Sequence, residues 1–177
     1  SRSESGTIEI AKRPTQLLDI LLEAHREARI LAERKHIAVT LNSQMDSPII
    51  VNGDPQRLRQ LFMIIIDNAV NYTKLGGAIN VDMASDGTTA RVTVADNGVG
   101  ISERDIPYVF QRFYRVKQGR QDIAQSGSGL GLAIAKWIAE AHMGTVSIAS
   151  ILNRGTTVTI DLPLHGSETP PAGGGLQ

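Results

Sequence analysis

The residues best suited to chemistry begin with Asp96, which ends an alternating apolar run and precedes two glycines in ADNGVGIS, residues 95–102. Glycines at such a point let the backbone approach a ligand closely. A carboxylate at the end of a strand can also accept a hydrogen bond from a ligand amine. The same residues fit an Asx-turn followed by a helix cap, so both interpretations stay open for this segment alone.

A second candidate is GSGLGLAIAKWI, residues 127–138, where three alternating glycines lead into an apolar helix. Backbone N–H groups at a helix N-terminus favour an anion such as phosphate. The segment follows a polar loop rather than a strand, so it differs from the dinucleotide-binding fingerprint, and it lacks the Gly-Lys-Ser/Thr of a P-loop. A single glycine motif of this kind is weak evidence for phosphate binding.

The third candidate is a row of polar side chains on a helix that contains IIIDNAVNYT, residues 64–73. At about 100° per residue, Asn68 and Asn71 lie on the edge of the helix, after Gln60 and Ile64. Amide oxygens suit Mg²⁺, which keeps several waters and takes phosphate oxygens as further ligands. A helix with solvent-facing amides is the alternative. The face expected to be buried comprises Leu58, Leu61, Phe62, Ile65 and Ala69.

Periodicity and turn signals predict the elements that position these residues. The predicted helices cover residues 16–35, opened by Pro14 and Thr15, residues 54–73, opened by Asp54 and Pro55, and residues 130–142, with a further helix start at Ser102. Short strands are expected over residues 7–11, 36–41 and 48–53. Hairpins are expected from 78–85 with 90–95 and from 145–150 with 156–162. Hairpins with helices on one face predict an α/β fold, a two-layer sandwich whose mixed, mostly antiparallel sheet is covered by about three helices.

Length and composition bound the function classes. The chain has 177 residues, of which 41% are apolar, and no apolar run approaches the roughly 20 residues of a membrane span. Eighteen basic residues balance 18 acidic ones, which argues against a nucleic-acid or membrane-surface partner. There is no cysteine, so disulfides and thiolate metal sites are excluded.

In this order the three segments resemble the ATP-binding catalytic domain of sensor histidine kinases, in the superfamily that includes DNA gyrase and the Hsp90 chaperones and shares the Bergerat fold. DNAVNYT resembles the family's N box, DNGVGI its G1 box and GSGLGLAIAK its G2 box. VFQRFYRV, residues 109–116, resembles the F box, which narrows the resemblance to the histidine kinase branch. GTTVTIDLP resembles the closing strand, and the resemblance covers residues 8–163.

The resemblance implies MgATP as the ligand. It makes Asp96 the residue that binds the exocyclic amine of adenine, with Thr156 supporting the carboxylate. It also places Gly98, Gly100 and Ile101 around the adenine. At the phosphate end it makes Asn68 the Mg²⁺ ligand. It also makes Asn68 and Arg115 the catalytic residues, because the F-box arginine reaches the γ-phosphate. Residues 117–128 form the expected lid. The further nucleotide-binding residues that it implies are Asn71, Tyr72, Lys74, Gly127, Ser128, Gly129, Leu130, Gly131 and Leu132.

The implied reaction is γ-phosphoryl transfer from ATP to a histidine on a separate dimerisation hairpin, for relay to a response regulator. None of the four histidines lies in the acceptor motif, since His25, His36, His142 and His165 are followed by Arg, Ile, Met and Gly. We expect residues 1–7 to end a linker from that hairpin, residues 8–164 to form the catalytic domain and residues 165–177 to be disordered. The isolated domain is expected to be monomeric, and the full-length protein a homodimer with this domain in the cytoplasm, below a membrane anchor.

Two positions depart from the family pattern. Ile64 stands where many of these kinases carry asparagine and where the gyrase and Hsp90 branches carry a catalytic glutamate. Asn71 stands where a lysine or arginine often holds phosphate, although Lys74 follows one turn later. The weakened N box leaves a degenerate, non-catalytic nucleotide-binding signalling module as the alternative. The F box argues against a third possibility, an anti-sigma-factor serine kinase.

Overall fold

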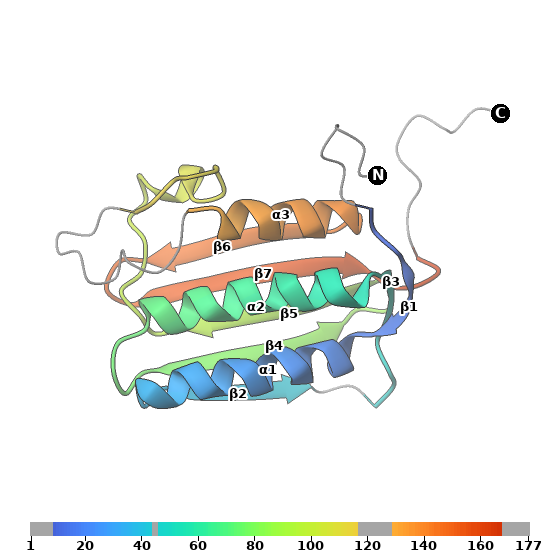
Figure 1. The fold of residues 1–177 in the computed structure, drawn as a ribbon, viewed down its shortest axis with the longest axis horizontal. Helices are drawn as coiled ribbons and strands as arrows, with labels where there is room; N and C mark the ends of the chain where they lie inside the picture. Colours follow the sequence, from blue (N-terminus) through green and yellow to red (C-terminus); the bar gives the residue numbers. More distant parts are fainter. Residues whose placement is uncertain (1–8, 44–45, 117–128, 168–177) are drawn as a thin grey trace.

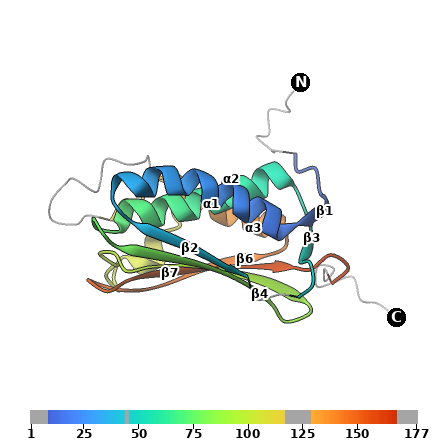
Figure 2. The ribbon, with the colours of Figure 1, turned by 90° about the horizontal axis from the view of Figure 1, so that it is seen from below.

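Five strands form a mixed sheet, and helices cover only one of its faces (Figures 1 and 2). The computed structural model describes residues 9–43, 46–116 and 129–167. The strand order is β2-β4-β5-β7-β6, and only the β2–β4 pair is parallel. These strands are β2 (Ala38–Ser43), β4 (Ala78–Ser85), β5 (Thr89–Asp96), β6 (Thr145–Ile151) and β7 (Gly155–Pro163). The predicted two-layer sandwich is confirmed.

The helical layer consists of α1 (Leu17–Arg34), α2 (Pro55–Tyr72) and α3 (Gly131–Ala141). The middle helix, α2, begins where its sequence predicts, because the Asp54 side chain accepts hydrogen bonds from the Gln56 and Arg57 backbone N–H groups. Its predicted buried face is confirmed, with Leu58, Leu61 and Phe62 fully buried against the sheet. No helix in the described ranges is long and apolar enough to cross a bilayer.

A two-stranded sheet lies at one end of the molecule and corrects the prediction for the N-terminal segment. Here β1 (Arg13–Gln16) pairs antiparallel with β3 (Ile50–Gly53). Residues 9–11, part of the expected strand over 7–11, form no strand, and residues 7–8 lie outside the described ranges. Pro14 and Thr15 belong to β1 instead of opening the helix, since the Thr15 hydroxyl donates to the Gly53 carbonyl at 3.1 Å. An edge strand tolerates a proline.

The helix predicted to start at Ser102 is wrong in extent, because only the short 3₁₀ turn η1 (Ile106–Tyr108) forms. The Ser102 hydroxyl donates to the Asp105 carboxylate at 2.6 Å, so it does not cap backbone N–H groups. Residues 101–116 therefore run as a turn-rich segment from the end of the G1-like motif through the F-box-like motif.

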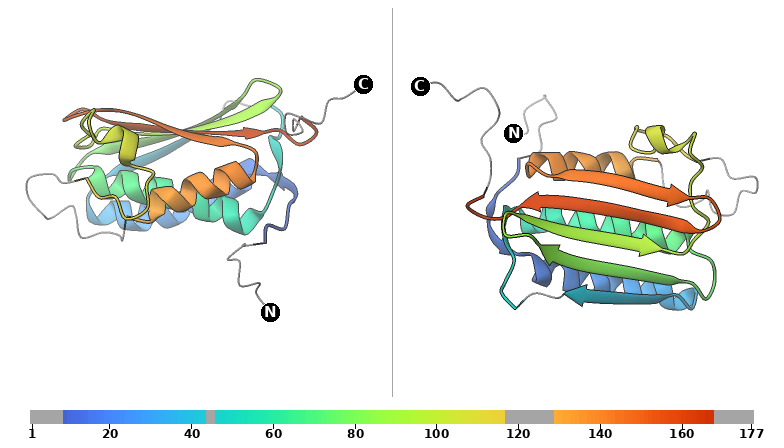
Figure 3. Two further views of the ribbon diagram at one scale, coloured as in Figure 1. Left: turned by 90° about the horizontal axis from the view of Figure 1, so that it is seen from above. Right: turned by 180° about the vertical axis from the view of Figure 1, so that it is seen from behind.

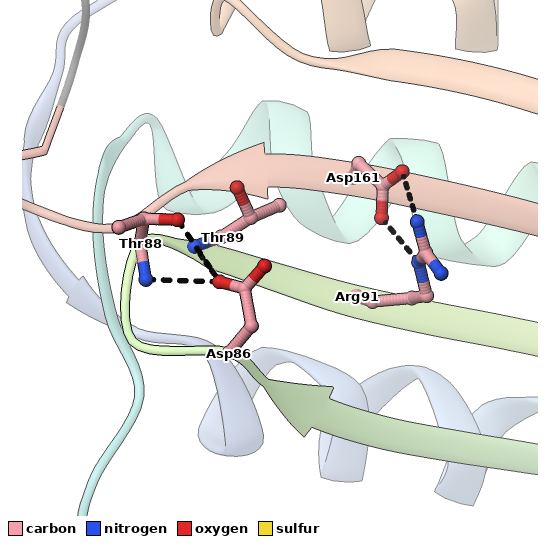
Figure 4. Close-up of polar contacts among 5 residues, drawn as sticks. All are labelled: Asp86, Thr88, Thr89, Arg91 and Asp161. Carbon is pink, nitrogen blue, oxygen red and sulfur yellow. Dashed lines mark hydrogen bonds and ion pairs between the residues drawn. The ribbon is translucent and has the colours of Figure 1, made fainter.

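Polar side chains fix the turn of the β4–β5 hairpin (Figure 4). The Asp86 carboxylate accepts from the backbone N–H groups of Thr88 and Thr89 at 2.9 and 2.8 Å. On the next strand, Arg91 of β5 donates two hydrogen bonds to Asp161 of β7, at 2.8 and 3.1 Å. Arg91 and Asp161 lie on the face of the sheet that the helices leave uncovered (Figure 3). The predicted hairpin, with its turn between Ser85 and Thr89, is confirmed.

Four chain segments meet at the end of the molecule opposite β1 and β3 (Figure 1). They are the C-terminal end of α2, the end of β5, the N-terminal end of α3 and the start of β7. Because α2 and α3 both pack on the covered face, their ends lie over the sheet at this position. The three motifs from the sequence are therefore brought to one place.

Candidate nucleotide-binding site

A small cavity of about 30 Å³ lies between the helices and the sheet at this end. Its lining is mainly apolar, with Asp96, Asn68, Tyr72 and Thr156 as the polar members. Six residues predicted for nucleotide binding line it: Asn68, Tyr72, Asp96, Ile101, Leu132 and Thr156. The other lining residues are Ile65, Ala69, Val94, Ile148 and Val158. A nucleotide base needs these walls to move apart, since the cavity is only large enough for about one water.

Among the described residues that line this cavity, Asp96 is the only carboxylate. Its Oδ1 atom accepts from the backbone N–H of Gly98 at 2.9 Å and of Thr156 at 3.2 Å. Burial raises the pKa of Asp96, and these two hydrogen bonds partly oppose the shift. No described residue hydrogen-bonds to Oδ2. The second oxygen can therefore accept from a donor that enters the cavity.

Ser150 of β6 supports this arrangement and was missed by the sequence reasoning. Its hydroxyl accepts from the Ile101 backbone N–H at 2.7 Å and lies 2.7 Å from the Thr156 hydroxyl. It also lies 3.0 Å from the Gly155 carbonyl oxygen. Ser150 thus ties the loop after Asp96 to the start of β7. A serine on an alternating strand carries no sequence signal for such a role.

The glycines after Asp96 allow close packing within the protein. A Cβ atom at Gly98 would lie 2.2 Å from the carbonyl oxygen of Tyr72. Gly100 has a φ of +69°, and its Cβ would lie 2.1 Å from the carbonyl oxygen of Ile151. Neither glycine lines the cavity. Their part in shaping an adenine pocket stays a prediction. They seat the Asp96 loop between α2 and the β6–β7 turn.

The edge of α2 separates the predicted residues into two groups. Asn68 and Tyr72 line the cavity, whereas Asn71 and Lys74 do not. The Lys35 ammonium donates to the carbonyls of Val70 and Asn71 at 2.8 and 3.3 Å and so caps the end of α2. Ile64 is half-buried and packs toward α3, since a Cβ at Gly131 would lie 3.3 Å from its Cγ2. Ile64 therefore acts as a packing residue between two helices.

Asp67, beside Asn68, is a second feature that the sequence reasoning missed. Its Oδ1 atom is buried without a hydrogen-bond partner, and burial raises the pKa of the carboxyl group. An unpaired buried oxygen of this kind is destabilising. Nothing in the motif pattern distinguishes this aspartate from an exposed one.

The start of α3 lies at the same end. Leu130 is the N-cap residue, and no side chain of the described residues caps the helix. Free N–H groups and the helix dipole make such a terminus favourable for an anion. Gly129 and Gly131 flank this N-cap, and Leu132 lines the cavity. Gly127, Ser128 and the expected lid over 117–128 lie outside the described residues.

Arg115 is exposed and does not line the cavity, but its charge acts on it. Burial raises the pKa of Tyr72, and the positive charge of Arg115 opposes that shift. The positive charge of Arg115 therefore acts on one residue of the cavity lining.

The described residues fit a metal that arrives with its phosphate ligands. They contain no cluster of three or more His, Cys, Asp or Glu side chains suited to a metal ion. Asn68 offers one neutral amide oxygen at the cavity. Mg²⁺ is commonly held by one or two protein groups together with substrate phosphates and water, so this sparse donor set fits it.

Comparisons with known proteins agree with this geometry. The family described as histidine kinase-, DNA gyrase B-, and HSP90-like ATPase matches residues 53–166. The signal transduction histidine-protein kinase BaeS of Escherichia coli K12 is 35% identical over 168 residues, which cover 93% of this chain and 35% of BaeS. The chain therefore spans about a third of the length of that relative.

Two solved structures share the fold. The mycobacterial sensor histidine kinase MprB matches with a TM-score of 0.75 and 27% identity, over 86% of this chain and 98% of that one. Full-length ShkA in complex with AMPPNP matches with a TM-score of 0.76 and 25% identity, over 89% of this chain and 32% of ShkA. The sequence match runs from the last residue of β3 past the end of β7, so this chain belongs to the histidine kinase-, DNA gyrase B-, and HSP90-like ATPase family.

Proposed function

We propose that this chain is the ATP-binding catalytic domain of a two-component sensor histidine kinase. It binds MgATP and transfers the γ-phosphoryl group to a histidine on a separate dimerisation hairpin, for relay to a response regulator. The observation that carries the proposal is Asp96, which places one hydrogen-bonded and one available carboxylate oxygen in an apolar cavity. An uncapped helix N-terminus lies at the same end of the molecule.

In this proposal the adenine ring enters the cavity and its exocyclic amine donates to Oδ2 of Asp96. Oδ1 stays bonded to Gly98 and Thr156, so the carboxylate is held in place before the ligand arrives. Apolar walls formed by Ile101, Leu132 and neighbouring residues cover the ring faces and exclude water. A low-dielectric surrounding strengthens the polar contact to the amine.

The phosphates extend toward the start of α3 and toward Arg115. Backbone N–H groups near Leu130 and the Arg115 guanidinium stabilise their negative charge. Asn68 is the side chain that would hold Mg²⁺, which when bound neutralises phosphate charge. Phosphoryl transfer asks a protein mainly for positioning and charge stabilisation, so no general base is needed from the position of Ile64.

The acceptor histidine is supplied from outside the described fold. His142 has both ring nitrogens engaged, one with the Asp54 backbone N–H and one with the Ile138 carbonyl. His25 is bonded to the Val39 carbonyl at 2.9 Å. The response regulator, a homodimer of the full-length protein and a cytoplasmic position below a membrane anchor are further parts of this proposal.

The test has two stages. Titration with MgADP, and with ADP plus a chelator, should give binding that weakens markedly without Mg²⁺. The chain alone with γ-labelled ATP should acquire no acid-labile label, whereas a cognate dimerisation hairpin added in trans should become labelled. Absence of nucleotide binding would reject the proposal. Tight MgADP binding without labelling of the hairpin would identify a degenerate nucleotide-binding module instead.

A further inference from the structure

Asp105 joins two parts of the segment that precedes the expected lid. The residue is buried, with 8% of its surface exposed. One carboxylate oxygen accepts from the Ser102 hydroxyl at 2.6 Å, and the other accepts from the Tyr114 hydroxyl. Both donors lower the pKa of Asp105, so the carboxylate is the form that the contacts stabilise. The bond to Tyr114 spans nine residues of the chain.

The backbone before Tyr114 is held from its other side. Phe113 has a φ of +65°, a left-handed conformation that is uncommon for a bulky residue. Its N–H donates to the Gly129 carbonyl at 2.9 Å, and a Cβ at Gly129 would lie 2.8 Å from the Phe113 carbonyl carbon. The Tyr114 ring packs beside that of Tyr108, with 5.7 Å between centroids. Tyr114 is therefore fixed by its backbone, its ring and its hydroxyl.

Arg115 follows directly, and its own side chain has no such support. It is exposed, and none of the described residues forms a hydrogen bond or ion pair with its guanidinium. Its charge nevertheless reaches Tyr72 in the cavity lining. Tyr114 therefore fixes the backbone from which the Arg115 side chain extends.

We propose that Asp105 is a positioning residue which, through the Tyr114 hydroxyl, sets the place of the Arg115 guanidinium at the phosphate end of the bound nucleotide. The inference rests on the proposed function, since it takes the γ-phosphate as the group that Arg115 meets. Neither Asp105 nor Tyr114 lines the cavity. Their effect should therefore depend on how many phosphates the ligand carries.

The test compares dissociation constants for MgAMPPNP, an ATP analogue, and MgADP. Tyr114→Phe removes only the hydroxyl that binds Asp105. We expect it to weaken MgAMPPNP binding roughly three- to tenfold, which is the size of effect that one typical lost hydrogen bond has, and MgADP binding less than about twofold. Asp105→Asn keeps the shape of the side chain and one acceptor oxygen. It should therefore change the ratio of the MgAMPPNP and MgADP dissociation constants by a smaller factor, and it replaces Tyr114→Phe in the test if that variant does not fold.

Tyr108→Phe is the matched control, because it removes a hydroxyl from the same segment that has no hydrogen-bond partner among the described residues. It should leave both constants unchanged. Arg115→Ala should abolish the preference for three phosphates, and adding Tyr114→Phe to it should cause no further loss. Such non-additivity is expected only if Tyr114 acts through Arg115.

The outcomes separate the inference from the proposed function. If Tyr114→Phe weakens both ligands equally, or if its effect adds in full to that of Arg115→Ala, the positioning role is rejected and nucleotide binding stands. If Arg115→Ala leaves the preference unchanged, the role of Arg115 fails and the inference fails with it. If the wild-type chain binds neither ligand, the proposed function itself is rejected.

Discussion

At the scale of single residues, two neighbouring elements hold aspartates with raised pKa values in different settings. Burial raises the pKa of both Asp67 and Asp96. Asp96 has two backbone donors on one oxygen, whereas Oδ1 of Asp67 is buried without a partner. The same physical effect therefore marks a prepared ligand contact in one residue and a local destabilisation in the other.

Asp96→Asn should separate ligand binding from stability. The amide oxygen can keep the bonds to Gly98 and Thr156, which turns the NH₂ group toward the cavity, where it opposes the adenine amine. Because the folded pKa lies above 3.8, ionisation of Asp96 with rising pH lowers stability. At pH 7 the free energy of unfolding of the variant should therefore equal that of the wild type or exceed it by up to about 1 kcal/mol. Its affinity for ADP should fall at least about tenfold.

Calorimetric titration and denaturant unfolding measure these two effects. Asp161→Asn is the control, since it removes a carboxylate that pairs with Arg91 on the open face of the sheet. That variant should bind ADP normally. Wild-type ADP affinity in the Asp96→Asn variant would show that Asp96 does not bind the adenine.

At the scale of elements, the loop after β5 is placed by backbone contacts at glycines. The Val99 N–H donates to the Tyr72 carbonyl at 3.0 Å, and the Asn153 N–H donates to the Val99 carbonyl at 2.7 Å. These bonds hold the loop against the end of α2 and against the β6–β7 turn. The distances at Gly98 and Gly100 leave no room for a side chain.

Gly100→Ala should therefore destabilise the fold more than an alanine at a glycine with the same kind of backbone but open space. Gly87 has a φ of +95° and no atom within 4 Å of a built Cβ, so Gly87→Ala should lose only about 1 kcal/mol. Gly100→Ala adds a clash with the Ile151 carbonyl and should lose about 3 kcal/mol or more. Urea unfolding of both variants measures the two losses in the free energy of unfolding. Equal losses would contradict the prediction, because they would show that the backbone at Ile151 shifts at little cost.

Local signals explain which elements could be predicted. The capping pair Asp54–Pro55 and the apolar periodicity fixed α2, and alternation fixed the hairpins. The strand β1 was missed because its pairing with β3 joins segments more than 30 residues apart. Of the candidate site, Asp96 and Asn68 carried motif signals. Ser150 did not, since its partner Ile101 lies 49 residues away. Asp105 has nearby partners, but an aspartate soon after Ser102 has the pattern of a helix start and so gave no sign of the contact with Tyr114.

At the scale of the whole molecule, His142 links the end of α3 to the start of α2. The side chain is 3% exposed at the C-terminal end of α3. Its Nε2 accepts from the Asp54 N–H at 3.0 Å, at the start of α2, and its Nδ1 lies 2.7 Å from the Ile138 carbonyl. Burial lowers the pKa of His142, the Ile138 hydrogen bond opposes that shift, Lys12 adds to it and Asp54 opposes it. The neutral ring is the form that this packing holds.

Stability should therefore depend on pH through His142. Since the folded pKa of His142 lies below 6.5, the unfolded chain binds the proton more tightly than the folded chain. The contribution of His142 to the free energy of unfolding is therefore complete above pH 6.5 and declines as the pH falls. The slope is at most about 1.4 kcal/mol per pH unit for one proton. Unfolding of the wild type and His142→Gln between pH 7.5 and 5 measures it. The variant should lack this part of the slope, and parallel curves would contradict the assignment.

The small strand β3 receives contacts from both ends of the described chain. Residues of β1 pair along one side of it, while Leu164 bridges to Val51 and the His165 N–H donates to the Ile50 carbonyl at 2.8 Å. The C-terminal end of α2 and the end of β5, which supply Tyr72 and Asp96 to the cavity lining, lie at the far end of the molecule from β3 (Figure 1). A mechanical force applied through residues 13 and 165 is consequently taken up by one four-residue strand, and the line of tension bypasses the end that holds Asp96.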